Sequence, residues 1–180
     1  MMTYIGLLRG VNVGGHKAVS MGDLRGLLST MGFEDPRTLL VSGNIVFRTA
    51  RGPTAALEKR LEGEAKKRLG LETLFFVRTP DEWKSLIAGN PFPREALHDP
   101  SHLLAMPLKN APSAAAVKAL VGAIRGRESV RVRGDIAYIT YPDGIGTSKL
   151  TNTLIESTLD TRGTARNWNT VLKLAALAAD

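Results

Sequence analysis

A glycine-rich stretch near the start of the chain has the composition of an anion-binding loop. It lies between an apolar run that predicts a strand and a well-capped helix, and it runs Arg9-Gly10-Val11-Asn12-Val13-Gly14-Gly15-His16-Lys17. Glycines permit positive φ and let backbone N–H groups approach a ligand closely. Arg9, His16 and Lys17 add positive charge beside a helix N-terminus. The stretch therefore predicts a site for a phosphate or a carboxylate.

Amide and basic side chains in later segments form a second set of candidates. Amides both donate and accept hydrogen bonds, which suits base or sugar edges better than proton transfer. Lys149 and Arg166 are each expected in the opening turn of a helix, where the helix dipole disfavours a cation. An anionic partner would explain them, and the alternative is a solvated charge. The predicted ligand-binding residues are Arg9, Asn12, Gly14, Gly15, Lys17, Asn44, Lys149, Arg166, Asn167 and Asn169.

Structural roles compete with ligand binding for most of the amides. Asn44 lies in an expected turn, where we favour a positive-φ residue over a ligand contact. Asn12 is a candidate to tie the long loop to its own backbone. Asn167 and Asn169 stand near a helix start, where they would serve equally well as local caps. Trp168 has the helical spacing of a core anchor, which we favour over stacking on a base.

The chain offers few groups for catalysis. Gly10 and Gly15 bracket four residues, as in a phosphate-binding P-loop, but His16-Lys17 follows where Lys-Ser or Lys-Thr is required. The sequence shows neither paired carboxylates nor a motif that activates a nucleophile. His16 is therefore only a weak candidate for an acid or base. No motif implies a metal or any other cofactor.

Composition favours a polyanionic partner. The 180 residues include 24 Lys and Arg against 17 Asp and Glu, a net charge of +7. Such a charge attracts nucleotides or nucleic acid, and it also serves solubility. Cysteine is absent, so disulfides and thiolate chemistry are excluded. Because no apolar run has the length of a signal peptide core or a membrane span, we expect a cytoplasmic protein with no membrane partner, and the oligomeric state stays open.

Hydrophobic periodicity predicts a complete fold in the first half of the chain. The expected order is strand, helix, strand, strand, helix, strand, over residues 4–8, 20–31, 38–41, 45–48, 53–69 and 74–77. This is the split βαβ order of a ferredoxin-like sandwich, an antiparallel sheet with both helices on one face. A short helix over 79–87 follows. We place the first subdomain at residues 1–90 and a connector at 91–101.

The second half, residues 102–180, repeats this plan imperfectly. Strands are expected at 103–108, 130–133 and 136–141, with helices at 112–124 and from about 148. The sixth element is expected to be a helix that begins near Thr164 instead of a strand. The prediction is an α+β fold of two ferredoxin-like subdomains, the second ending in an extra C-terminal helix.

Four sequence blocks resemble those of a known family. In order they are Arg9-Gly10-Val11-Asn12-Val13-Gly14-Gly15, Ser42-Gly43-Asn44, Ser148-Lys149-Leu150-Thr151 and Thr164-Ala165-Arg166-Asn167-Trp168-Asn169-Thr170-Val171. They look like the blocks of the DUF1697 family of proteins of unknown function. The resemblance implies two ferredoxin-like subdomains, in agreement with the periodicity. It implies no reaction and assigns no catalytic residue.

Three functions follow from these residues. We favour a small binding module that holds a phosphate-bearing ligand, a nucleotide or nucleic acid, in a cleft between the subdomains. The alternative is an enzyme acting on a small phosphorylated or carboxylated metabolite, with His16 as acid or base and the basic residues as an electrostatic clamp. In the third, the blocks are purely structural and lock the subdomains together through buried amide and Arg hydrogen bonds.

Overall fold

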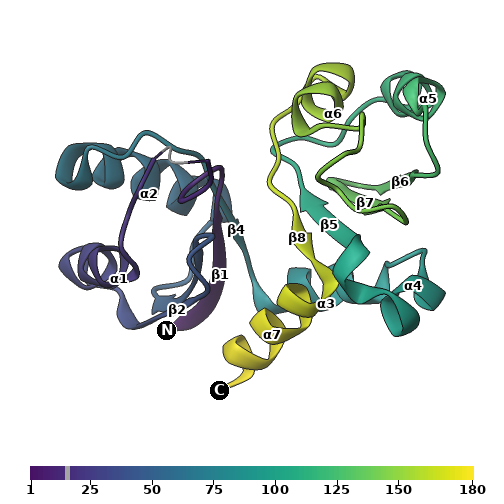
Figure 1. Ribbon diagram of the computed structural model, residues 1–180. Coiled ribbons are helices and arrows are strands. Elements are labelled where there is room, and N and C mark those ends of the chain that lie inside the picture. The colour runs from purple at the N-terminus through teal and green to yellow at the C-terminus, as the bar shows by residue number, and fades with distance from the viewer. Residues whose placement is uncertain (15–16) are drawn as a thin grey trace. The chain divides into compact units, whose positions relative to one another are not determined.

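The chain folds into two compact units, seen in a computed structural model that describes residues 1–14 and 17–180 (Figure 1). The first unit contains Met1–Ser85 and Lys173–Asp180, and the second contains Leu86–Leu172. Helices α3 (Pro80–Ala88) and α7 (Trp168–Ala179) each contribute to both units. None of the described helices combines the length and apolar character needed to cross a bilayer.

The first unit is a four-stranded antiparallel sheet with two helices on one face. Its strands have the order β2-β3-β1-β4. The elements are β1 (Met2–Leu8), α1 (Met21–Thr30), β2 (Glu34–Leu39), β3 (Asn44–Thr49), α2 (Thr54–Leu69) and β4 (Phe75–Arg78). Capping residues mark two helix ends: Ser20 Oγ accepts from Asp23 N–H at 3.0 Å at the start of α1, and Gly70 ends α2 with φ of 61°. Local cap chemistry therefore delimits both helices.

Alternation along the strands of the first unit builds its core. One set of strand side chains, including Tyr4, Leu8 and Phe47, packs with Leu28 of α1 and Leu61 of α2 in a single buried cluster. These are the apolar positions that period-two and period-3.6 spacing predict for a sheet covered by amphipathic helices.

The second unit has the same topology. Its strand order is β6-β7-β5-β8, and its elements are β5 (Leu103–Pro107), α5 (Ala114–Ala123), β6 (Ser129–Arg133), β7 (Ile136–Thr140), α6 (Asn152–Leu159) and β8 (Arg166–Asn167). The prediction of an α+β fold with two ferredoxin-like subdomains is confirmed. The expectation of a helix in place of the sixth strand missed β8, because two residues are too few to show a strand period.

Stretch 91–101, expected to connect the subdomains, lies within the second unit. It contains α4 (Pro93–His98) and most of a short 3₁₀ helix (Pro100–His102). Proline at the first position suits both helices, because its missing N–H has no partner there in any case.

Carboxylates on the second helix of each unit bind backbone N–H groups beside the edge strand. In the first unit Glu58 Oε1 accepts from Val77 N–H at 2.8 Å, and Glu62 Oε1 accepts from Phe75 N–H at 3.0 Å. In the second unit Glu156 Oε2 accepts from Gly163 N–H at 3.0 Å. These bonds satisfy donors that no neighbouring strand pairs, and they close the edge to other chains.

Two buried tyrosines tie the sheet of the second unit to helix α3 and to the segment before α6. Tyr138 donates its hydroxyl hydrogen to the carbonyl oxygen of Leu86 at 2.5 Å, and Tyr141 donates to that of Leu150 at 2.9 Å. Burial raises the pKa of each phenol to about 12. Both side chains are only 1% exposed, so ionisation would place an unpaired charge in the core.

Replacing Glu58 by Ala is expected to lower the free energy of unfolding by about 2–4 kcal/mol. The change removes the acceptor of a buried N–H and separates Arg78 from a carboxylate whose Oε1 lies 3.5 Å from its Nη1. Urea unfolding measures it. Glu64→Ala, on the outer side of the same helix, is the matched control and should have a much smaller effect. Equal losses from the two variants would contradict the edge role of Glu58.

Tyr141→Phe is expected to change how stability depends on alkaline pH. Because the folded pKa is raised above the unfolded value near 10, the stability linked to this tyrosine is fully present below pH 10, and the free energy of unfolding falls by about 2–3 kcal/mol as pH rises from 10 toward 12. The variant should lose about 1 kcal/mol at neutral pH and then fall less steeply than the parent between pH 10 and 12. Parallel pH curves for parent and variant in chemical unfolding would refute this.

Candidate functional site

We define the glycine loop as residues 9–19, of which the structure describes 9–14 and 17–19. The sign of φ alternates from Gly10 to Gly14. Gly10, Asn12 and Gly14 have φ of 65°, 54° and 58°, while the residues between them do not have positive φ. Lys17 also has positive φ, at 47°. Such conformations cost energy outside glycine and persist only where the surroundings enforce them. Gly15 and His16 lie outside the described residues, and with them the prediction that His16 is an acid or base.

Asn12 fixes the loop with three hydrogen bonds. Its Nδ2 donates to the carbonyl oxygens of Val19, at 2.8 Å, and Val41, at 2.7 Å, and its Oδ1 accepts from Val19 N–H at 2.8 Å. One side chain thus joins the early part of the loop to its last residue and to the turn between β2 and β3. This agrees with the structural role expected for Asn12, which ties the loop to nearby backbone groups.

The turn between β2 and β3, residues 40–43, packs directly on the glycine loop. Leu8 N–H donates to the carbonyl oxygen of Gly43 at 2.9 Å. A Cβ added to Gly43 would lie 2.6 Å from Val11 Cγ2 and 2.9 Å from Leu8 Cβ, and its φ is 85°. Only glycine fits this position. The first two sequence blocks therefore meet in the first unit.

A third segment, just before β4, borders the same loop. Arg9 N–H donates to the carbonyl oxygen of Leu74 at 3.0 Å, and the Thr73 hydroxyl donates to the carbonyl oxygen of Arg9. Nearby, Lys66 Nζ lies 2.8 Å from Glu72 Oε1. The hydrogen bond from Lys66 is the main cause that lowers the pKa of Glu72, and the charge of Lys17 adds a smaller effect. Lys17 therefore lies within electrostatic range of this segment.

Apolar side chains are exposed around these loops. Val13, Leu40 and Val41 have exposed fractions of 53%, 51% and 67%. Leu40 also has φ of 60°, a rare conformation for a large side chain. The sequence indicated a strand through Val41, but β2 ends at Leu39. We missed Leu40 and Val41 as surface residues because an apolar β-prone run normally predicts a buried strand.

Asn44 directly follows the turn between β2 and β3 and is a core residue. It is fully buried, and its Nδ2 donates to the carbonyl oxygen of Leu39 at 2.7 Å and to Ser42 Oγ at 3.1 Å. The expectation that Asn44 takes positive φ is wrong, because Gly43 and Leu40 take that role. Asn44 is the first residue of β3 and has strand geometry.

The remaining predicted residues belong to the second unit. Lys149 is exposed but precedes α6, whose N-cap is Thr151. Arg166 lies in β8 and not in a helix, and it is only 8% exposed. Its Nη1 donates to Thr164 Oγ1 at 2.7 Å and to the carbonyl oxygen of Ala165 at 2.9 Å. Burial lowers the pKa of Arg166 to about 10. The helix-dipole argument therefore applies to neither cation.

Asn167 and Asn169 differ in accessibility. Asn167 Oδ1 accepts from Thr170 N–H at 3.0 Å, so Asn167 caps the first turn of α7. A local cap was one of the two roles expected for it, beside ligand contact. Asn169 is exposed on that turn, and Trp168 beside it is 4% exposed. Burial of Trp168 agrees with a core anchor rather than a stacking platform.

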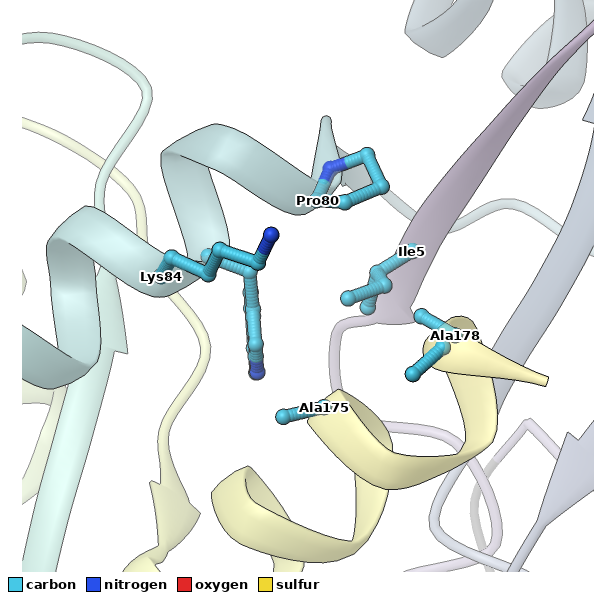
Figure 2. A pocket seen from close by; sticks show the side chains of 7 residues that line it. Ile5, Pro80, Lys84, Ala175 and Ala178 are labelled. Carbon is cyan, nitrogen blue, oxygen red and sulfur yellow. The ribbon is translucent and has the colours of Figure 1, made fainter.

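A separate apolar cavity of about 320 Å³ lies in the first unit (Figure 2). Figure 2 shows Ile5 from β1 facing Ala175 and Ala178 from α7, with Pro80 and Lys84 on α3. Trp83 and Ala179 complete the lining, and no predicted ligand residue belongs to it.

Among residues 1–14 and 17–180, no three His, Asp or Glu side chains are grouped closely enough to hold a metal.

Gly43→Ala is expected to lower the free energy of unfolding by at least about 2 kcal/mol, because it adds a clash to an unfavourable φ. Gly70→Ala is the matched control: its φ of 61° is similar, but nothing lies within 4 Å of the added Cβ. That control should cost only about 1 kcal/mol. Thermal and urea unfolding compare the two. Equal losses would mean that the contact with Leu8 and Val11 does not constrain the turn.

Comparison with known proteins places the chain in a family. It matches the DUF1697 family, described as proteins of unknown function, over residues 1–138, which include the first two sequence blocks. A conserved bacterial protein from Streptococcus pneumoniae has a solved structure with a TM-score of 0.70, 20% identity and coverage of 98% of each chain. That likeness concerns the fold alone. No curated protein matches the chain. Because the family match covers most of its length, the chain belongs to the DUF1697 family.

Proposed function

We propose that this protein is a binding module for a phosphate-bearing ligand, a nucleotide or nucleic acid, and that the glycine loop of the first unit contacts the phosphate. The observation that carries the proposal is the alternation of φ sign from Gly10 to Gly14. In an anion-binding nest, a residue with positive φ beside one with negative φ turns neighbouring backbone N–H groups toward one side. The Asn12 N–H donates to the carbonyl oxygen of Lys17 at 3.3 Å, so the N–H groups on either side of it are the candidates for phosphate. The three hydrogen bonds of Asn12 restrain this backbone before a ligand binds, so that little conformational entropy is lost on binding.

Charge around the loop favours an anion. Lys17 is exposed on the loop, and Arg9 is half-buried where the loop leaves β1. Lys66 stands nearby, paired with Glu72. A lysine ammonium binds phosphate as a flexible point charge, so Lys17 is the first candidate for direct contact.

Exposed apolar side chains beside these cations favour a ligand with more than a phosphate. Val13, Leu40 and Val41 would contact the base or sugar while the loop holds the phosphate. Four of the predicted ligand residues are structural supports in this proposal: half-buried Asn12 ties the loop, Asn44 and Arg166 are buried, and Asn167 caps α7. Exposed Lys149 and Asn169 remain candidate contacts on the second unit.

The test is fluorescence anisotropy with short single-stranded RNA, single-stranded DNA and duplex DNA, at low and near-physiological salt, with free nucleotides as competitors. Lys17→Ala should weaken binding about tenfold, because it removes one charge-assisted contact. Binding that survives added salt, and that one nucleotide displaces, supports a formed site rather than general attraction to the +7 charge.

Lys59→Ala is the matched control for this test, because Lys59 is an exposed lysine of α2 in the same unit. It removes the same charge away from the loop and should leave affinity nearly unchanged. If the two variants lose affinity equally, the attraction comes from net charge and the proposed site is refuted. The same conclusion follows if the parent binds none of the probes.

A further inference from the structure

Three of the four sheet edges that the structure describes are blocked. Edge strand β2 has a register shift between Glu34 and Arg37, positive φ at Asp35, and Pro36, which lacks an N–H. The outer N–H groups of β4 bind the carboxylates of α2. Strand β8 has only two residues, and a carboxylate of α6 binds the N–H of Gly163 beside it. Each is a known way to prevent pairing with another chain.

Strand β6 is different. All five of its residues pair in unbroken register with β7, from Ser129 opposite Thr140 to Arg133 opposite Ile136. Because the two-residue turn makes Arg133 and Ile136 a hydrogen-bonded pair, alternation directs the N–H and C=O groups of Val130 and Val132 away from β7. Within the described part of the chain, no hydrogen bond reaches these outward groups. The edge is therefore regular and open.

Arginines give this edge a definite charge. Arg131 and Arg133 are exposed on the same face of β6, and the strand carries no acidic residue. Contacts within the second unit hold both side chains in place: the Arg131 guanidinium lies 5.6 Å from the Phe92 ring centre, and Arg133 Nη1 donates to the carbonyl oxygen of Gly89 at 2.7 Å. Each guanidinium keeps further N–H donors for a carboxylate.

We propose that the open edge of β6 binds an extended acidic peptide segment of a partner protein as an added antiparallel strand. Backbone groups of Val130 and Val132 would pair with the peptide, and acidic side chains at alternate positions would meet Arg131 and Arg133. The proposal is independent of the glycine loop, because it concerns other residues in the other unit.

Charge favours such a peptide over a second copy of this chain. Two β6 strands paired antiparallel about their centres would place Arg131 opposite Arg131, and like charges directly opposite each other destabilise a pair of strands. An acidic segment meets the same arginines with the opposite charge.

The experiment measures binding of a fluorescein-labelled heptapeptide of alternating glutamate and valine to the full-length protein by anisotropy. If the peptide forms the added strand, its valine N–H groups face β6 while its glutamates lie beside the arginines. N-methylation of the valines should abolish binding, and N-methylation of the glutamates should leave it nearly unchanged. This comparison leaves the protein intact, so it does not depend on the folding of a variant.

A charge exchange tests the arginine contribution. Arg131→Glu should weaken binding of the glutamate peptide at least about tenfold and allow binding of the matching lysine peptide. Lys118→Glu, on the exposed side of α5, is the matched control and should do neither. No binding at millimolar peptide, equal effects of the two N-methylated peptides, or equal effects of the two variants would overturn the proposal. So would sedimentation showing that the protein pairs with itself through this edge.

Discussion

Satisfaction of backbone hydrogen bonds at the sheet edges is the constraint on which both units depend. A four-stranded sheet leaves two strands with unpaired groups, and a carboxylate on the second helix of each unit binds one of them, through Glu58 in the first and Glu156 in the second. The bond also fixes where that helix lies against the sheet, because the acceptor must face one particular N–H. Both units thus share this helix-to-edge bond as well as their strand topology.

The same constraint explains the glycine loop. A long connection at the end of β1 has many donors and acceptors to satisfy, and the Asn12 amide pairs with both the N–H and the carbonyl oxygen of Val19 at its far end. Left-handed residues are tolerated there because the turn at Gly43 packs on the loop and holds it. The unfavourable backbone conformation and the exposed apolar side chains thus gather at one end of the first sheet. Exposed loop residues held by a folded scaffold are suited to recognition.

The second unit uses its polar blocks in another way. Arg166 and Asn167 are absorbed into β8 and the cap of α7, and Tyr141 anchors the segment that leads into α6. Arg166 and Asn167 resemble a recognition set in sequence, yet their side chains bond to nearby residues: Arg166 to Thr164 and Ala165, and Asn167 to the N–H of Thr170. The open edge at β6, whose Arg131 packs against Phe92, is by contrast not distinctive in the sequence.

The sequence by itself determined the element order, most caps and the fold class, because hydrophobic period and capping residues act over a few neighbouring positions. Helices begin after Ser20 and Thr79 and end at Gly70. Each of these residues acts on neighbours a few positions away, so the sequence alone indicates them. Only the tertiary structure decided which polar residues are accessible. Asn44 and Arg166 are buried, and Leu40 is exposed, because cross-strand pairing and the packing of distant loops set burial. Two-residue β8 also depends on pairing with β5, a contact between residues about sixty positions apart, which no local pattern encodes.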